Sequence, residues 1–284
     1  MKTLREVIQD AVKKEIAIPH FNVATMEALN GVVDAAKKLS IPVIIGVSEG
    51  ERDFIGLDQI VALVASFRAE GLPIYLNADH TYSFERVKEA IDAGFDAVIF
   101  DGAKLSLEEN IAQTKKCVEY ARSSGRDVLV EGELGYIGQS SKVLDAIPEG
   151  VSLVNLTTPD DALRFVKETG VDLFAPAVGN IHGMLRASKD PRLNIERVKE
   201  ISLATGVPLV LHGGSGTEDE DFVAAIKAGM AIVHVSTELR VALKEGIHEG
   251  VDAGDEIAPY KYMKPAREHV AEVAEARARL FVGM

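Results

Sequence analysis

Apolar residues recur along the chain in two alternating patterns, short continuous runs and longer stretches with a helical period. Apolar positions 4, 7, 8, 11 and 12 predict a helix over residues 4–14. From residue 16 onwards, short apolar runs predict buried strands, and the amphipathic stretches between them predict helices. The expected strands cover residues 16–23, 43–47, 73–78, 97–100, 127–130, 173–178, 208–211 and 231–235. The expected helices cover residues 26–39, 57–69, 84–93, 107–122, 160–169, 195–205, 219–228, 239–249 and 265–280.

This regular alternation of strands and helices predicts the fold class. Strands that are continuous apolar runs are typical of a parallel sheet buried on both faces. We therefore expect an α/β protein, a closed (β/α)8 TIM barrel with an extra N-terminal helix and a C-terminal helical extension, forming one catalytic domain over residues 1–284. An open doubly wound sheet is the alternative, and the short regular turns favour closure. The long irregular segment 136–159 indicates a functional lid.

Composition narrows the possible partners and compartments. The formal net charge of −13 disfavours nucleic acid and anionic membranes as general partners. Cys117 is the single cysteine, so we expect no disulfide framework and no cysteine metal site, which suits a reducing cytoplasm. The amino terminus does not have a signal-peptide pattern, and no apolar run is long enough for a membrane helix. We expect a soluble cytoplasmic protein.

Three predicted strands are each followed by a histidine, and this placement predicts a metal site. His80 follows the strand 73–78, His182 follows 173–178, and His212 follows 208–211. The carboxyl ends of the strands of a TIM barrel form one rim, where its chemistry is located. Three histidine ligands with one open position are typical of catalytic zinc. The sequence therefore predicts that these three histidines bind Zn²⁺.

The other four histidines fall into two groups. His234 ends the strand 231–235 on the same rim, so it is either a fourth ligand or, as we prefer, a contact to substrate. The remaining three, His20, His248 and His269, do not share this placement. We therefore do not assign them to the site.

Acidic residues stand at the same rim. Asp79 adjoins His80, and we expect a general acid/base at a substrate hydroxyl; the alternative is a carboxylate that orients a ligand imidazole. Asp101 and Glu133 follow neighbouring strands. Three roles are open for them: a structural role, a hydrogen bond to a metal ligand, or the binding of a second metal ion.

Two segments on the rim predict a phosphate site. The run His212-Gly213-Gly214-Ser215-Gly216 has the glycine density that lets backbone amides approach a phosphate. The segment from His234 through Val235, Ser236 and Thr237 adds amides and hydroxyls at the start of a helix. Barrels of this kind usually bind phosphate at the loops after their last two strands, which is where both segments lie.

Taken together, these motifs give the chain a marked resemblance to class II, zinc-dependent ketose-bisphosphate aldolases of the fructose-bisphosphate and tagatose-bisphosphate type. The resemblance covers nearly the whole chain. Its specific elements, in order, are Asn77-Ala78-Asp79-His80, Phe100-Asp101-Gly102, Glu131-Gly132-Glu133-Leu134-Gly135, Gly179-Asn180-Ile181-His182-Gly183 and His212-Gly213-Gly214-Ser215-Gly216.

The resemblance implies a role for each matching position. Asp79 would be the acid/base at the C4 hydroxyl of the ketose, and the metal ligands would be His80, His182 and His212. Dihydroxyacetone phosphate would be held by Gly183, Gly213, Gly214, Ser215, His234, Val235, Ser236 and Thr237. Asp101 and Glu133 match a second metal position of some members. Lys264 would face the other phosphate, and the final helix with Arg267 would make a contact in a homo-oligomer, a dimer or a tetramer.

The chain departs from this family in two places. Relatives usually carry acidic residues in the loop after the fifth strand, one of which exchanges a proton on dihydroxyacetone phosphate. Here that loop reads Gly138-Gln139-Ser140-Ser141-Lys142, and the nearest acids are Asp145 and Glu149. An asparagine is also usual where this chain has His234. Both departures bear on rate and substrate more than on reaction class.

The leading functional hypothesis is reversible cleavage of fructose 1,6-bisphosphate to dihydroxyacetone phosphate and glyceraldehyde 3-phosphate. Tagatose 1,6-bisphosphate is the close alternative, because the two sugars differ only at C4. A second enzymatic hypothesis is an aldolase that acts on another phosphorylated ketose. The non-enzymatic hypothesis is a phosphosugar-binding protein without catalytic activity. A lysine Schiff base is disfavoured because no predicted strand contains a lysine.

Overall fold

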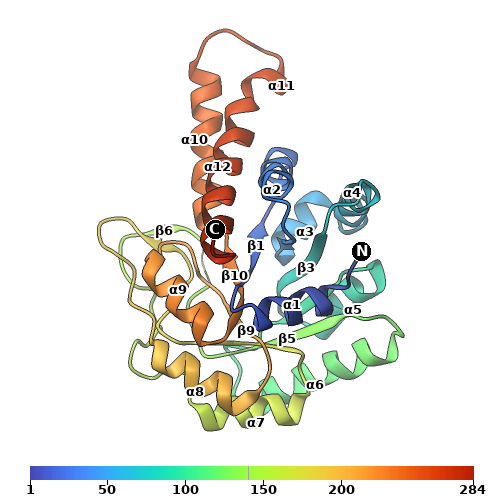
Figure 1. Cartoon of the computed structure of the whole chain (residues 1–284), viewed down its shortest axis with the longest axis vertical. Coiled ribbons are helices and arrows are strands. Elements are labelled where there is room, and N and C mark those ends of the chain that lie inside the picture. Colours follow the sequence, from blue (N-terminus) through green and yellow to red (C-terminus); the bar gives the residue numbers. More distant parts are fainter. Residues whose placement is uncertain (140) are drawn as a thin grey trace.

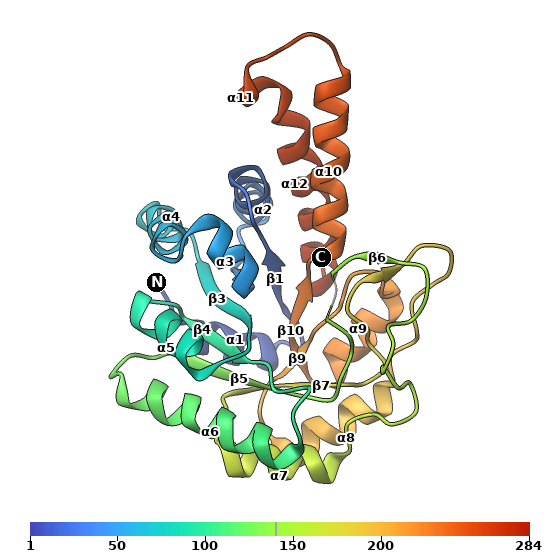
Figure 2. The same cartoon turned by 180° about the vertical axis from the view of Figure 1, so that it is seen from behind.

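A closed parallel barrel forms the centre of the molecule in the computed structural model, which describes residues 1–139 and 141–284 (Figures 1 and 2). The barrel strands are β1 (Ile18–Asn22), β2 (Val43–Val47), β3 (Ile74–Thr81), β4 (Ala97–Phe100), β5 (Leu129–Leu134), β7 (Leu173–Pro176), β9 (Leu209–Leu211) and β10 (Met230–Val235). Their order around the barrel is β1-β10-β9-β7-β5-β4-β3-β2, and each neighbouring pair is parallel. The predicted (β/α)8 barrel is confirmed.

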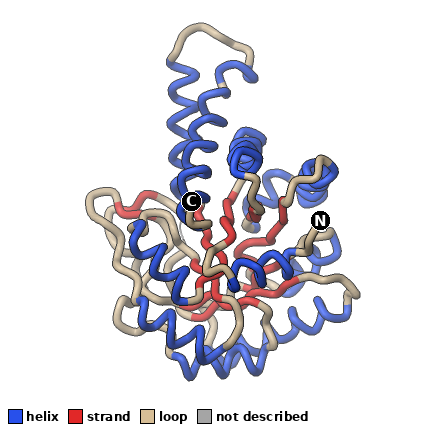
Figure 3. Tube along the Cα trace, in the orientation of Figure 1, coloured by secondary structure: helices blue, strands red, loops and turns tan. Residues whose placement is uncertain are grey.

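Helices surround the barrel on its outer side (Figure 3). They are α1 (Leu4–Lys13), α2 (Met26–Leu39), α3 (Glu49–Ile55), α4 (Leu57–Ala69), α5 (Phe84–Ala93), α6 (Leu107–Ser123), α7 (Pro159–Thr169), α8 (Ile195–Thr205), α9 (Asp219–Ala228), α10 (Thr237–Asp252), α11 (Pro259–Tyr262) and α12 (Lys264–Phe281). In the described part of the chain, none of them has both the length and the apolar character that crossing a bilayer requires.

Local sequence signals set the helix ends. Thr25 and Ser83 cap α2 and α5 by accepting hydrogen bonds from backbone N–H groups of the first turn. Gly94 ends α5 in a left-handed conformation that glycine adopts without steric cost. Each of these capping residues stands directly beside the apolar pattern of its helix in the sequence.

Apolar side chains are buried in two separate clusters. The larger cluster lies between the barrel and its helices, and includes Phe165 and Phe174. The smaller one joins α1 to the amino ends of the strands, where Ile8 meets inward-facing residues such as Ile44 and Val210. The α1 helix therefore covers the amino end of the barrel, and the carboxyl end remains for the site.

The chain departs from the predicted elements in four places. The helix α3 precedes α4, where the sequence predicted only the second. The strand β5 continues to Leu134, so Glu131 and Glu133 lie inside a strand. Within the segment 136–159, β6 (Val143–Leu144) pairs with β8 (Met184–Leu185) and forms a small separate sheet. The short helix α11 joins α10 to α12 at the end of a projecting pair of helices (Figures 1 and 2).

Candidate active site

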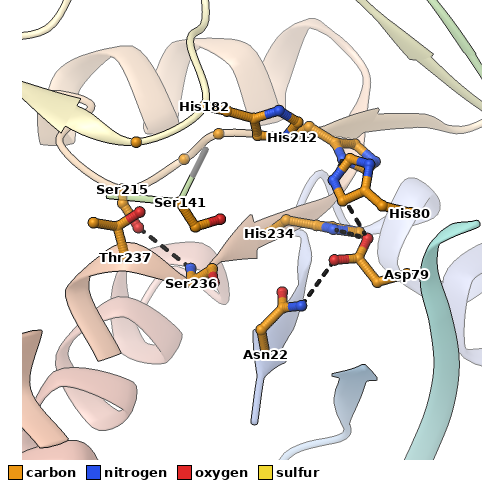
Figure 4. Close-up of a pocket in the computed structure, with 13 residues that line it drawn as sticks. Asn22, Asp79, His80, Ser141, His182, His212, Ser215, His234, Ser236 and Thr237 are labelled. Atoms are coloured by element: carbon orange, nitrogen blue, oxygen red, sulfur yellow. Dashed lines mark hydrogen bonds and ion pairs between the residues drawn. The ribbon is translucent and has the colours of Figure 1, made fainter. Parts of the chain in front are cut away.

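Three histidines meet at the carboxyl end of the barrel. His80 lies on β3, His182 follows β7, and His212 follows β9. One ring nitrogen from each lies within 4.8 Å of the others, and Figure 4 shows the three rings gathered on one side of the cavity. The distance from His212 Nδ1 to His80 Nε2 is 3.2 Å. This is a group that could hold one metal ion.

The opposite nitrogen of each ring is held in place by another group. His80 Nδ1 lies 2.9 Å from Asp101 Oδ2, and His212 Nε2 lies 2.7 Å from Glu131 Oε1. His182 Nδ1 donates to the carbonyl oxygen of Gly138 at 2.6 Å. Metal-binding histidines almost always have such a partner, because it fixes both the ring orientation and the tautomer. The surroundings therefore fit a metal ion at the converging nitrogens.

Backbone geometry explains how Asp79 and His80 serve the same cavity. Successive side chains of a strand normally point to opposite faces. His80 has a φ of +34°, and the pairing of β3 with β4 shifts between Ala78 and Thr81. Asp79 Oδ1 consequently lies 3.7 Å from His80 Nε2, so the two side chains reach the same cavity instead of pointing to opposite faces of the strand. A left-handed conformation of this kind at a non-glycine residue is often found at functional sites.

Asp79 is a buried carboxylate with several polar neighbours. Asn22 Nδ2 donates to Asp79 Oδ2 at 2.8 Å, and His234 Nδ1 lies 3.5 Å from Asp79 Oδ1 (Figure 4). Burial by itself would raise the pKa of Asp79, but the nearby His80 and His234 lower it well below its usual value. Asp79 is therefore ionised at neutral pH and can accept a proton.

The other acids around the histidines have different charge states. Burial, together with the neighbouring Asp101, raises the pKa of Glu133 to about 8. Asp101 would also be raised by burial, but its hydrogen bond with His80 brings its pKa below the usual value. Glu133 Oε2 lies 3.6 Å from His80 Nδ1. The group of His80, Asp101 and Glu133 could hold a second ion.

The predicted phosphate segments line the same cavity as Asp79 and the three histidines. The lining residues include Gly183, Gly213, Gly214, Ser215, His234, Ser236 and Thr237. Gly213 has a φ of +62°, and a Cβ atom there would lie 2.0 Å from the carbonyl oxygen of Ile181. Only glycine fits this turn, which brings the backbone to the cavity wall.

Two of the predicted substrate contacts differ in detail from the expectation. Ser215 Oγ accepts from the backbone N–H groups of Ser236 and Glu238 at 3.3 and 3.2 Å, which leaves its own hydrogen free to donate. Val235 is fully buried in the cluster between barrel and helices. Its side chain is therefore turned away from the cavity, and only its backbone is close to the predicted site.

Sequence reasoning did not assign several groups that the fold brings to the site. These are His20, Asn22, Glu51, Glu131 and Ser141. The sequence did not place His20 with the histidines at the strand ends. In the structure its ring stacks on that of His234, with the ring centroids 3.4 Å apart. Asn22 ends β1 and Glu131 directly follows the predicted strand 127–130, so their positions carried a signal. His20 is two residues deeper in the barrel than Asn22, and its contact depends on strand register.

Glu51 and Arg240 connect the cavity wall to two other elements. Arg240 Nη2 donates to Glu51 Oε1 at 2.6 Å, and Asn22 Nδ2 donates to Glu51 Oε2 at 3.0 Å. Arg240 Nη1 also donates to the carbonyl oxygen of Ser141 at 3.3 Å. These bonds join α10, α3 and the loop after β5, and they support the asparagine that contacts Asp79.

The loop after β5 does not bring an acid to the site in its described part. Ser140 of the sequence Gly138-Gln139-Ser140-Ser141-Lys142 lies outside the described residues. Asp145 is exposed and pairs with Arg186 at 2.9 Å, and Glu149 is also exposed. Neither acid faces the cavity in this structure.

The two basic residues predicted on the final helix are both at the surface. Arg267 makes two hydrogen bonds to Asp34 of α2, at 2.6 and 2.7 Å. Lys264 lies 3.4 Å from Glu268 and is largely exposed. Arg267 is thus engaged within its own chain, and Lys264 remains accessible.

Comparison with known proteins gives one consistent result. The family model described as "Fructose-bisphosphate aldolase class-II" matches residues 2–283. Fructose-bisphosphate aldolase from Staphylococcus aureus (strain Mu50 / ATCC 700699) is 36% identical, covering 98% of this chain and 96% of that protein. The corresponding Staphylococcus epidermidis protein (strain ATCC 12228 / FDA PCI 1200) is 35% identical with the same coverage.

A solved structure agrees with these sequence relatives. The crystal structure of the YdjI aldolase from Escherichia coli K12 has a TM-score of 0.83 and 34% sequence identity, and the match covers 98% of this chain and 96% of that one. The three histidines, the adjacent aspartate and the glycine-rich turn stand where the sequence motifs predicted them. The chain belongs to the class II fructose-bisphosphate aldolase family, whose members are carbon–carbon lyases that depend on a divalent metal ion.

Proposed function

We propose that this protein catalyses the reversible cleavage of fructose 1,6-bisphosphate to dihydroxyacetone phosphate and glyceraldehyde 3-phosphate, with Zn²⁺ held by His80, His182 and His212. The observation that carries the proposal is the placement of an ionised carboxylate, Asp79, beside three converging imidazoles in one cavity. The family membership and the names of the relatives support the substrate.

Zinc bound to the three imidazoles would polarise the ketone carbonyl of the substrate. Asp79 accepts the proton of the C4 hydroxyl during cleavage. As the C4 carbonyl forms, the C3–C4 bond breaks and its electron pair remains on the dihydroxyacetone fragment, which becomes an enediolate. The enediolate then takes up one proton at C3 to give dihydroxyacetone phosphate, and Asp79 releases the proton that it accepted, so the cleavage is balanced. In the direction of condensation, Asp79 returns the proton to the new hydroxyl. Asn22 holds the carboxylate through its hydrogen bond to Oδ2, so the other oxygen faces the reacting group.

The phosphate of the dihydroxyacetone half is assigned to the glycine-rich turn and the start of α10. Gly213, Gly214 and Ser215 line this end of the cavity, and Ser215 offers its hydroxyl hydrogen. The N–H of Gly214 donates to the carbonyl oxygen of His234 at 3.0 Å, so the amides of Gly213 and Ser215 are the candidates for the phosphate. Gly183, Ser236 and Thr237 complete the wall. Figure 4 places Ser215, Ser236 and Thr237 together, on the side of the cavity away from Asp79. The substrate would therefore lie with its phosphate and its C4 hydroxyl at opposite sides.

Further parts of the proposal concern the whole protein. Residues 1–284 would act as one catalytic domain, working in the cytoplasm as a homo-oligomer, a dimer or a tetramer. Asp101 and Glu133, together with His80, would offer a second metal position. Lys264, exposed on the projecting helices, remains the candidate for the second phosphate across a subunit contact.

Two alternatives remain beside fructose 1,6-bisphosphate. Tagatose 1,6-bisphosphate differs only in its configuration at C4, so a direct comparison of the two is needed. A non-catalytic phosphosugar-binding protein is disfavoured, because Asp79 and the three histidines are all present in one cavity.

The test of reaction class is cleavage of both sugars, side by side, by protein stripped with a chelator and by the same protein restored with zinc. We expect triose phosphate only from the restored protein, with fructose 1,6-bisphosphate the faster substrate. A faster reaction with tagatose 1,6-bisphosphate would change the substrate and keep the class. Equal cleavage with and without metal would overturn the zinc proposal.

Replacing Asp79 separates an aldolase from a binding protein. The variant Asp79→Ala removes the proton acceptor, so we expect kcat for cleavage to fall by about 10²–10⁴-fold. Bound zinc, measured by metal analysis, should stay near one ion per chain, because the three imidazoles are unchanged. Unchanged turnover in this variant would contradict the role of Asp79.

A further inference from the structure

Two histidines form a parallel stack inside the barrel, directly beneath the cavity. His20 on β1 and His234 on β10 stand opposite each other in the register of two paired strands. Their ring centroids are 3.4 Å apart and their planes differ by 3°. His20 is fully buried and His234 is 5% exposed. Two imidazoles in face-to-face contact are thus built into the wall of the barrel.

Neighbouring residues are shaped to receive the His20 ring. A Cβ atom at Gly46 of β2 would lie 2.0 Å from the Cε1 atom of His20, so the ring occupies the space that a side chain would fill. His20 Nε2 lies 3.3 Å from the Asn77 amide nitrogen. Because an amide N–H donates, Nε2 accepts and the ring proton is on Nδ1. The position and tautomer of His20 are both set by its neighbours.

The contacts of His234 determine which of its nitrogens meets the substrate. Its Nδ1 lies 3.5 Å from Asp79 Oδ1, and we place the ring proton on Nδ1 because Oδ1 is a buried acceptor that otherwise has no hydrogen-bond partner. Its Nε2 is buried and has no hydrogen-bond partner, although His234 lines the cavity. A buried polar atom without a partner is costly unless a ligand satisfies it. The free Nε2 lone pair is therefore available to a donor on the substrate.

A metal ion shared by this pair is a weaker interpretation of the same geometry. His20, Asp79 and His234 are close enough to be a candidate group. The lone pair of an imidazole lies in the plane of its ring, and these two planes are parallel at stacking distance. Two such rings cannot both direct a lone pair at an ion between them. The stack favours an orienting role.

We propose that His20 is a positioning residue, which fixes the plane of His234 so that Nε2 accepts a hydrogen bond from a hydroxyl of the dihydroxyacetone half of the substrate. This proposal rests on the proposed aldolase function. It assigns to His234 a purely accepting contact, whereas an asparagine side chain at that position could either donate or accept. It also assigns a role to His20, which touches no substrate atom.

The kinetic test compares two replacements of His20 that are close to it in size. His20→Gln keeps a planar group that can lie against His234 and can accept from Asn77, whereas His20→Leu keeps bulk and loses the flat face. Each variant is restored with zinc and assayed for cleavage of fructose 1,6-bisphosphate. Zinc content and thermal unfolding are measured alongside, so that a loss of folding or metal is recognised.

We expect kcat of His20→Leu to fall by about 10–100-fold at unchanged zinc content, because a small displacement of a positioned group costs this much. KM should change by less than about threefold, because the phosphate contacts remain. His20→Gln should stay within about fivefold of the wild-type kcat. Equal activity of both variants, or an equal loss in both, would overturn the positioning role.

A second measurement needs neither activity nor a variant. Nitrogen-detected NMR of the histidine rings in metal-free wild-type protein reports which nitrogen of each ring carries the proton. We expect Nδ1 to be protonated and Nε2 unprotonated in both His20 and His234. A proton on Nε2 of His234 would overturn the proposal even if His20→Leu does not fold. If the wild-type protein cleaves no ketose, the proposed function fails, and the NMR result still decides the orientation of the pair.

Discussion

The three histidines of the metal group differ in the charge of the residue behind them. His80 and His212 each face a carboxylate, Asp101 and Glu131, whereas His182 faces the neutral carbonyl oxygen of Gly138. Burial lowers the pKa of His182 to about 3. Burial would also lower the pKa of His212, but Glu131 raises it above its usual value. The carboxylates therefore make two of the three imidazoles stronger electron donors.

Replacing Glu131 tests this support. In Glu131→Gln the side-chain oxygen can still accept from His212 Nε2, but the negative charge is lost. We expect the affinity for zinc to fall by about 10–100-fold, as is typical when the partner of a metal-binding histidine is changed. Titration of metal-free protein with zinc, in competition with a chelator, measures the affinity directly.

Glu109→Gln is the matched control, because Glu109 caps α6 through Ser106 at the surface. Its zinc affinity should equal that of the wild type. If Glu131→Gln also bound zinc with wild-type affinity, Glu131 would be a structural acid only.

At the scale of single residues, the sequence was informative where function follows from chain position. Asp79 and His80 lie at the end of β3 and His212 follows β9, and in a barrel all strands of one direction end at one rim. Glu131 and His20 were not assigned because their roles depend on partners from distant strands. His20 meets His234 across 214 positions of the chain, through a register between β1 and β10 that no local pattern specifies.

The packing of α10 against α12 depends on residues without side chains. A Cβ atom at Gly246 of α10 would lie 2.5 Å from Ala266 Cα and 2.6 Å from its backbone nitrogen. Gly250 approaches the carbonyl oxygen of Tyr262 even more closely, at 1.7 Å from its ideal Cβ position. Backbone atoms cannot rotate away as a side chain can. Replacing Gly246 must therefore separate α10 from α12, and replacing Gly250 must separate α10 from Tyr262 at the end of α11.

The variant Gly246→Ala should therefore be less stable than the wild type. Alanine gains about 1 kcal/mol of helix propensity over glycine, but overpacking a close contact costs about 1–3 kcal/mol. With backbone atoms in the way, we expect a net loss of about 1–2 kcal/mol in the free energy of unfolding, measured with urea.

Gly50→Ala on α3 is the control, because Gly50 is exposed and nothing lies within 4 Å of its ideal Cβ position. It should gain up to about 1 kcal/mol from helix propensity. A gain in both variants would show that α10 and α12 adjust freely.

At the scale of elements, periodicity predicted the long helices and the buried strands, because each buries a continuous apolar face. It missed α3, whose buried residues are the polar Glu51 and Arg52. It also missed β6 and β8, which are two residues long and exist only as a pair. Short elements of this kind are held by tertiary contacts, such as the bond from Arg240 to Glu51.

The stability of the whole molecule should depend on pH through buried ion pairs. Asp221 is 3% exposed and accepts from Arg192 at 2.8 and 2.6 Å and from the backbone of Leu193 at 3.0 Å. Burial would raise the pKa of Asp221, but these hydrogen bonds lower it below its usual value. An acid whose pKa is lower in the folded state stabilises that state when ionised.

We expect Asp221→Asn to lower the free energy of unfolding by about 1–2 kcal/mol at pH 7. The difference from the wild type should be constant down to about pH 5, and should shrink as the pH falls below about 4 towards the folded-state pKa. Urea unfolding at pH 7, 5 and 3.5 measures it.

Asp219→Asn on the same helix is the control, because Asp219 is exposed and its pair with Arg277 lies at the surface. Exposed pairs contribute about 0–1 kcal/mol. A difference for Asp221→Asn that persists undiminished at pH 3.5 would show that the charge of Asp221 is not its cause.

The whole barrel could be predicted because its signal is repeated in every strand–helix unit and each repeat reinforces the others. The projecting pair of helices could not be placed in the same way. A helix that extends beyond the core has the same periodicity as one that lies against it, and only the contacts of α12 with α2 and α10 fix its direction (Figure 1).

The position of α1 determines where substrates can enter the barrel and where products can leave it. Its apolar face fills the amino end of the barrel, so the described part of the chain gives ligands access at the carboxyl end. The ketose and both trioses must then pass through the same mouth, and a molecule lodged there obstructs all three. An uncleavable ketose bisphosphate should accordingly compete with the substrate in cleavage and with either triose in synthesis.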